Sequence, residues 1–219
     1  YVAKGRMEEP MQILSVINKF FTQQKNVVKS SFSGKRALVT AGPTVEVIDP
    51  VRYVSNRSSG KMGYAIAEAL RDKGAIVTLI SGPTHLSLPE GINVVKVESA
   101  DDMFQAVTER FAKQDIVIKA AAVSDYTPMD ILEHKLKKQE GGLSVQFKRT
   151  KDILKYLGEN KTHQYLVGFA AETQNIEQYA LDKLKRKNAD VIISNNVGDT
   201  SIGFSSDDNE LTMHFKNNE

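Results

Sequence analysis

Apolar residues follow two different spacings along the chain. Short runs rich in Val and Ile predict buried strands, whereas apolar residues three and four positions apart predict amphipathic helices. From residue 36 onward the two kinds of segment alternate. Strands are predicted at residues 37–40, 75–80, 115–118, 165–169 and 190–194. Helices are predicted at about 61–73, from an N-cap at Ser99 through 111, and at about 175–188.

This alternation predicts the fold class. Strands joined by helices require right-handed crossovers and mainly parallel pairing. We therefore expect an α/β fold, a Rossmann-like three-layer sandwich, in which residues 211–215 form an edge strand. Ligands bind beyond the carboxyl ends of such strands, so the site is expected after Thr40, Ile80, Ile118 and Phe169.

The first 35 residues differ from the rest. Residues 9–21 have helical spacing, with Pro10 in the first turn, and residues 22–35 have the polar, Ser- and Gly-containing composition of a linker. We expect a terminal helix at 1–21, a linker at 22–35 and one folded domain at 36–219.

Composition excludes several classes of protein. A net charge of +2 gives no electrostatic reason to expect nucleic acid or a membrane surface as partner. The chain has no cysteine, which excludes disulfides, thiolate metal sites and a cysteine nucleophile, and fits the cytosol. No apolar run approaches the roughly 18 residues of a membrane span.

A polar, glycine-bearing loop at 49–63 leads into a helix N-terminus. Free N–H groups and the helix dipole there would attract a phosphate or carboxylate, and Arg52 and Arg57 would add charge. The alternative is a solvated connection in which Ser58 or Ser59 only caps the helix. A phosphate-binding P-loop is rejected, because its earlier glycine is missing and Met62 replaces the required Ser or Thr.

Three further segments are candidates for binding. The small residues of 120–126 would let a ligand approach the backbone, with Asp125 as acceptor, and the lysines of 135–138 are expected to form a flexible cationic flap that closes on a polyphosphate. In 168–173, Phe169 is placed to stack on a base. The alternative for the alanine-rich segment and for Phe169 is core packing, and for the lysine run it is a solvated charged face. Lys183 and Lys187 lie one helical turn apart on a predicted helix, and their alternative role is as surface lysines.

Taken in order, these segments closely resemble the phosphopantothenoylcysteine synthetase family, the ligase half of a bifunctional bacterial protein of coenzyme A biosynthesis. Residues 5–10 resemble the end of the flavin-dependent decarboxylase half. The family continues beyond 211–215 into a final helix, so we expect a truncated C-terminus. The matching motifs are Thr40–Thr44, Asp49–Asn56, Ser58–Gly63, Ala121–Tyr126, Lys135–Lys138 and Gly168–Thr173.

The resemblance implies a reaction. The carboxylate of 4′-phosphopantothenate attacks the α-phosphate of CTP, and the amine of L-cysteine then displaces CMP from the acyl-cytidylate. By position, Arg52, Asn56 and Lys135 are the implied catalytic residues, and Arg52, Asn56 and Ala122 the implied substrate-binding residues. Implied nucleotide-binding residues are Lys119, Ala120, Ala121, Asp125, Lys135, Lys151, Asp152, Ile153, Leu154, Phe169, Lys183 and Lys187.

The resemblance also implies partners and cofactors. Mg²⁺ would be held by the phosphates of CTP and water, without a protein metal site. FMN would belong to the decarboxylase half of the full-length protein, and the ligase domain would form a homodimer that completes the phosphopantothenate site. Lys119 and the pair Thr150-Lys151 depart from the expected family pattern.

Two other classes remain as alternatives. An NAD(P)-dependent dehydrogenase of the short-chain type is suggested by the Tyr-x-x-x-Lys pair Tyr179 and Lys183. Against it, the glycines at 42, 60 and 63 are widely separated, and the second strand ends without an acid for the ribose. A non-catalytic binding module on the same fold is the other alternative, although Asn56 and Lys135 are both present.

Overall fold

A seven-stranded sheet forms the centre of the computed structural model, which describes residues 32–138, 141–172, 175–196 and 211–216. The strand order is β11-β10-β9-β6-β1-β4-β5, and every pair is parallel except β10 with β11. The strands are β1 (Arg36–Ala41), β4 (Ile76–Ser81), β5 (Asn93–Lys96), β6 (Ile116–Lys119), β9 (Tyr165–Glu172), β10 (Val191–Asn196) and β11 (Leu211–Phe215).

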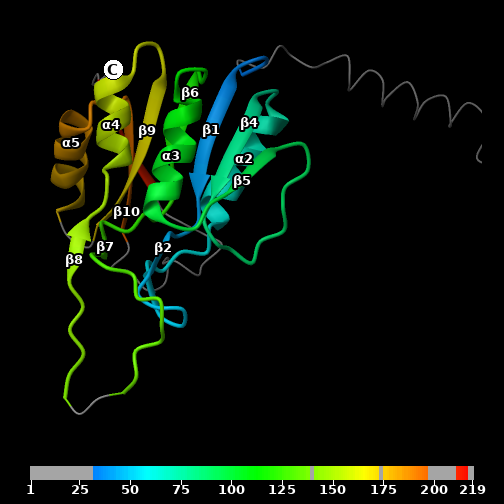
Figure 1. The fold of residues 1–219 in the computed structure, drawn as a ribbon. Coiled ribbons are helices and arrows are strands. Elements are labelled where there is room, and N and C mark those ends of the chain that lie inside the picture. Colours follow the sequence, from blue (N-terminus) through cyan, green and yellow to red (C-terminus); the bar gives the residue numbers. More distant parts are fainter. Residues whose placement is uncertain (1–31, 139–140, 173–174, 197–210, 217–219) are drawn as a thin grey trace, which may run out of the picture.

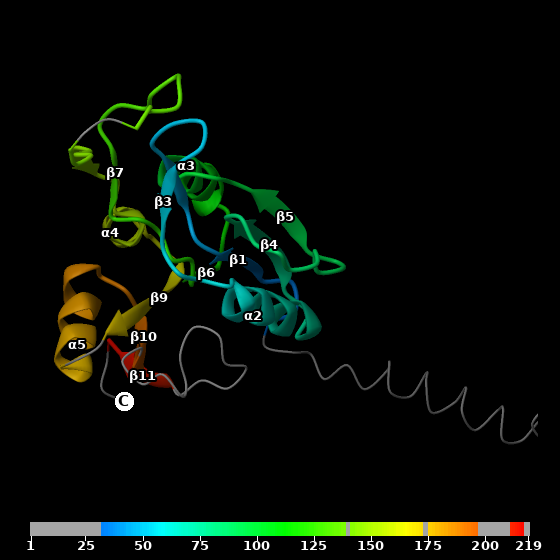
Figure 2. The same cartoon turned by 90° about the horizontal axis from the view of Figure 1, so that it is seen from below.

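Helices cover both faces of this sheet (Figures 1 and 2). Helix α2 (Lys61–Asp72) lies on one face, and α3 (Ala100–Phe111), α4 (Ile153–Asn160) and α5 (Ile176–Arg186) lie on the other. The Rossmann-like three-layer α/β fold is thus confirmed. Helix α3 begins with a capping box in which Ser99 and Asp102 bond reciprocally, as the predicted N-cap at Ser99 requires.

Two apolar clusters hold the layers together. One lies between the sheet and α3, α4 and α5 and includes Leu38, Val107 and Leu157, all fully buried. The other lies beneath α2, where the backbones come very close. A Cβ on Gly63 would stand 2.5 Å from the Cβ of Ala41, so only glycine lets α2 rest on β1.

Two small hairpins project beyond the carboxyl ends of the strands (Figure 1). The first pairs β2 (Val45–Val47) with β3 (Tyr53–Ser55), and the second pairs β7 (Tyr126–Pro128) with β8 (Phe147–Arg149). The predicted lysine flap at 135–138 belongs to the long connection between β7 and β8. Its expected mobility stays a prediction.

Two predictions concern parts of the chain at its start. The helix expected at 9–21, and most of the linker expected at 22–35, fall outside the described residues, and β1 begins at Arg36. Among the residues that are described, no helix is both long and apolar enough to cross a membrane.

Candidate active site

The crevice at the switch point between β1 and β6 is closed by backbone. The amide of Ala122 donates to the carbonyl of Gly42 at 2.9 Å, and the amide of Thr44 donates to the carbonyl of Ala122 at 3.3 Å. The Thr44 hydroxyl accepts the amide of Ser124 at 3.0 Å. The two loops therefore meet where a Rossmann dinucleotide fold holds its pyrophosphate, which argues against the dehydrogenase alternative.

A cleft of about 860 Å³ opens one strand further along, beyond β6 and β9. We call it the cationic cleft. It brings together ten of the twelve predicted nucleotide-binding residues; Ala120 and Lys135 are not among its lining residues. The ten are Lys119, Ala121, Asp125, Lys151, Asp152, Ile153, Leu154, Phe169, Lys183 and Lys187.

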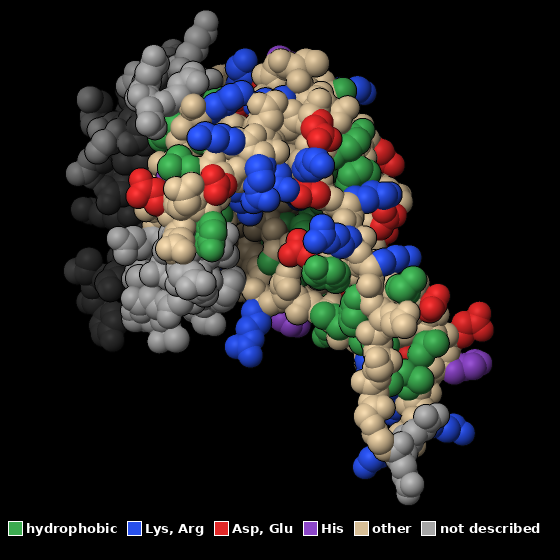
Figure 3. Space-filling model, turned by 90° about the vertical axis from the view of Figure 1, so that its left-hand side faces the viewer, with side chains coloured by type: hydrophobic (Ala, Val, Ile, Leu, Met, Phe, Trp, Pro, Cys, Tyr) green, Lys and Arg blue, Asp and Glu red, His purple; other side chains and the backbone are tan. Residues whose placement is uncertain are grey.

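Positive charge dominates this cleft. Seven lining side chains are Lys or Arg and two are carboxylates, and Figure 3 shows the cations gathered around a hollow. Three of the cations, Arg149, Lys155 and Arg186, were missed from the sequence. Nothing local distinguishes them from surface residues; only the packing of α4, α5 and β8 turns them toward one cleft.

The start of α4 supplies one wall. Asp152 is its N-cap and accepts the amide of Lys155 at 2.9 Å, while Lys187, the C-cap of α5, forms an ion pair with the same carboxylate. Burial raises the pKa of Asp152, but the bond from Lys187 and the backbone bond from Lys155 outweigh it, so the pKa lies below its ordinary value. Lys183 donates to the carbonyl of Phe169 at 2.8 Å.

Lys119 lies at the floor of the cationic cleft, at the end of β6, and is 7% exposed. Its amine donates to the hydroxyl of Thr40 at 3.2 Å and lies 3.8 Å from the sulfur of Met103. Burial lowers the pKa of this amine to about 7, and the charge of Asp152 offsets only part of that effect.

A second cluster ties the loop after β2 to the root of the flap. The side chain of Asp49 is fully buried and accepts the amides of Val51 and Arg52 at 2.8 Å and of Leu136 at 3.2 Å. Arg52 pairs with this carboxylate at 2.9 Å and donates to the carbonyl of Leu136 at 3.2 Å. Burial raises the pKa of Asp49, but these bonds lower it below the ordinary value.

Asn56 lies at the edge of the alanine-rich segment. Its amide nitrogen donates to the carbonyls of Val123 at 3.1 Å and Ala122 at 3.4 Å. The predicted substrate residues Asn56 and Ala122 are therefore in contact, and Val123 lines the cationic cleft. Donation from Asn56 to a substrate, as predicted, requires one of these two bonds to be exchanged.

The start of α2 differs from the alternative in which the 49–63 loop only supplies a serine cap. The N-cap of α2 is Gly60, at a φ of 79°, and no side chain caps the helix; neither Ser58 nor Ser59 does. Instead each serine hydroxyl accepts an amide two residues on, at 3.3 and 3.4 Å. Only glycine adopts this backbone without strain. Lys135 is exposed and stands apart from the cleft.

These features define a class: a Rossmann-type α/β domain with a strongly cationic cleft beyond its central strands and a tethered loop beside it. Comparison with known proteins gives the family. Residues 32–219 match the family described as DNA/pantothenate metabolism flavoprotein C-terminal domain, and the chain belongs to that family.

Named relatives agree with this assignment. The chain is 51% identical to the coenzyme A biosynthesis bifunctional protein CoaBC of Bacillus subtilis and 46% identical to that of Haemophilus influenzae, over 99% of this chain and 53% of each relative. It thus spans about half the length of these relatives. The crystal structure of the C-terminal domain of a CoaBC protein is 48% identical, with a TM-score of 0.73, covering 85% of this chain and 84% of that one.

Proposed function

We propose that this domain ligates 4′-phosphopantothenate to L-cysteine at the expense of CTP, through an acyl-cytidylate. One observation carries the proposal: a single cleft gathers ten of the twelve nucleotide residues implied by the family resemblance, beside the loop that holds Asn56. The names of the relatives support the same pathway.

The charge and size of the cationic cleft suit a nucleoside triphosphate. Its volume of about 860 Å³ falls within the usual range of small-molecule sites. A pair of opposite unit charges 4 Å apart gains roughly 4 kcal/mol at an effective dielectric of 20, before solvent screening. Six Lys and Arg side chains besides the buried Lys119, against two carboxylates, therefore favour a polyanion over a neutral nucleoside.

The loop after β2 is proposed to hold the acid. In the first step the phosphopantothenate carboxylate attacks the α-phosphorus of CTP and pyrophosphate leaves. In the second, the cysteine amine attacks the acyl carbon, CMP leaves with the bridging oxygen, and the amine loses a proton. Asn56 would donate to the acyl oxygen as negative charge develops there, where a carboxylate would repel it.

The flap is proposed to be held in place by Asp49, which binds the backbone where the flap begins. Asp49 holds both the guanidinium of Arg52 and the backbone of Leu136, so the substrate loop and the segment bearing Lys135 share one anchor. Lys135 would then meet the triphosphate when the flap lies over the cleft. This arrangement supports a catalytic role for Lys135 even though the side chain is exposed here.

Mg²⁺ is proposed to arrive with CTP. Among the described residues, no group of three or more His, Cys, Asp or Glu side chains is placed to hold a metal ion. The cleft offers only Asp125 at its rim and Asp152, which is paired with Lys187, so phosphate oxygens and water would supply most ligands. The ion would neutralise charge on the phosphates.

The family resemblance adds two protein partners to the proposal: a second copy of this chain and a flavin-dependent decarboxylase half in the full-length protein. It also implies a location in the cytosol. Apolar side chains exposed on two linked segments support the homodimer. Val51 and Tyr53 are 59% and 63% exposed, and Ile131 is 66% exposed, beside the bond from Leu132 to the Ile48 carbonyl.

Pyrophosphate release from CTP tests the proposal. We expect release that requires phosphopantothenate, and continuous turnover only when cysteine is also present. No release by the full-length protein would refute the ligase function. Titration with NADPH tests the dehydrogenase alternative, and the closed β1–β6 crevice predicts no quenching of NADPH fluorescence.

A further inference from the structure

Lys119 is a buried amine with too few hydrogen-bond acceptors. It is 7% exposed, and among the described residues its hydrogen-bond partners are one hydroxyl, from Thr40, and one thioether, from Met103. The Thr40 hydroxyl also accepts the amide of Ala121 at 3.2 Å, so it is shared. An ammonium group has three N–H donors, and among the described residues no carboxylate lies within ion-pair distance of this one.

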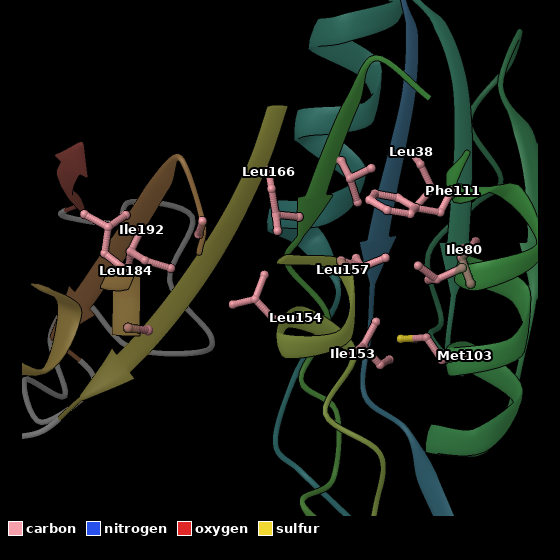
Figure 4. Packing of buried hydrophobic residues seen from close by; sticks show 14 of the residues in the cluster. Leu38, Ile80, Met103, Phe111, Ile153, Leu154, Leu157, Leu166, Leu184 and Ile192 are labelled. Carbon is pink, nitrogen blue, oxygen red and sulfur yellow. The ribbon is translucent and has the colours of Figure 1, made fainter. Parts of the chain in front are cut away.

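The surroundings of the amine explain why it is poorly solvated. The sulfur of Met103 from α3 lies 3.8 Å from the amine, and Met103 belongs to the buried apolar cluster, where it faces Ile153 from α4 (Figure 4). Asp152 is the carboxylate whose charge reaches Lys119, and Lys187 already holds it in an ion pair. On α5, Lys183 adds a second positive charge to the same cleft.

The side that remains open is the cationic cleft. Lys119 lines this cleft together with Lys151, Lys183 and Lys187. An anion held by those lysines would give the buried amine the counter-charge that the protein does not provide. Such an anion would raise the pKa of the Lys119 amine, because a neighbouring negative charge favours the protonated form.

We propose that Lys119 is the floor cation of the cleft and that it takes up its proton when the phosphates of a nucleotide enter, so that nucleotide binding and proton uptake are coupled. This inference rests on the proposed function for the identity of the ligand. In the empty cleft at mildly alkaline pH the amine is mostly uncharged, since burial lowers its pKa to about 7. With nucleotide bound it is an ammonium ion.

Calorimetry measures this coupling directly. CTP with Mg²⁺ is titrated into the protein at about pH 8 in buffers of different ionisation enthalpy, and the slope of the observed enthalpy gives the protons taken up. We expect roughly one proton per nucleotide at about pH 8 and close to none at about pH 6, where the amine is already protonated.

Variants of Lys119 and a control lysine test whether the proton is taken up by Lys119. Lys119→Met keeps the length of the side chain and should abolish the uptake, with Lys119→Leu as a second apolar replacement should the first fail to fold. Lys113→Met is the matched control, because Lys113 is exposed just before β6, at the opposite end of the sheet from the cleft. It should take up as many protons as the wild type.

The outcomes separate this inference from the proposed function. CTP binding without proton uptake, or equal uptake by the wild type and Lys119→Met, would overturn the role of Lys119 and leave the ligase function standing. Failure of the wild type to bind CTP would overturn the proposed function and, with it, this inference.

Discussion

Replacing Lys119 by Met should change the stability of the fold in a way that depends on pH, even without ligand. The amine has an ordinary pKa of 10.5 in the unfolded chain and a pKa of about 7 in the folded one. Between these values the unfolded chain binds more protons, so the stability of the wild type rises with pH in this window. Methionine has no such dependence.

The size of the effect follows from the shift. One pKa unit corresponds to about 1.36 kcal/mol, so the buried amine costs the wild type at most roughly 5 kcal/mol below about pH 6, where it is charged in both states. From about pH 7.5 to 9.5 the cost falls by roughly 2.5 kcal/mol. Lys119→Met should therefore be more stable than the wild type at neutral pH, by a margin that shrinks as the pH rises.

Urea unfolding followed by far-ultraviolet circular dichroism at several pH values measures this margin. Lys113→Met corrects for the general effect of removing one lysine, because that side chain is exposed. A constant difference in the free energy of unfolding between wild type and Lys119→Met across this pH range would contradict the prediction. It would mean that the folded protein does not depress the pKa of this amine.

Three further predictions concern the site and the core. Asn56→Asp should keep the fold and bind CTP, yet lower turnover roughly 100-fold, because a carboxylate repels the developing oxyanion; unchanged steady-state turnover would contradict the assigned role. Lys135→Gln should raise the KM for CTP with a smaller effect on kcat, so normal turnover at limiting CTP would count against a triphosphate contact. Gly63→Ala should destabilise the protein by about 1–3 kcal/mol in urea, since a Cβ there would stand 2.5 Å from that of Ala41; a wild-type midpoint would show that α2 does not rest on β1 as described.

Much of the fold is encoded in local patterns. The predicted strands and the helices α2, α3 and α5 are found within a few residues of their expected bounds, because each has a long apolar stripe or run. Strand β5 and the two hairpins were missed. Their strands have three or four residues, too few for a periodic pattern, and pairing across distant segments decides them.

Some residues of the site could likewise be predicted from local patterns, and others could not. The carboxyl-end rule brings Lys119, Asp125 and Phe169 to one cleft, as expected from their places at or just beyond the ends of the predicted strands, although β9 continues past Phe169 to Glu172. The anchoring role of Asp49 was not predictable, because its carboxylate reaches the amide of Leu136, 87 residues away. The burial of Lys119 likewise depends on Met103 from another element, which no local spacing reveals.

In the proposed reaction the acid is activated at the α-phosphate of CTP, so one oxygen atom of the acid must pass to the nucleotide. Phosphopantothenate labelled with ¹⁸O in its carboxylate is incubated with the full-length protein, CTP and cysteine, and the nucleotide product is analysed by mass spectrometry. The proposed mechanism predicts one labelled oxygen in CMP. Label in inorganic phosphate, with CDP as the product, would contradict it.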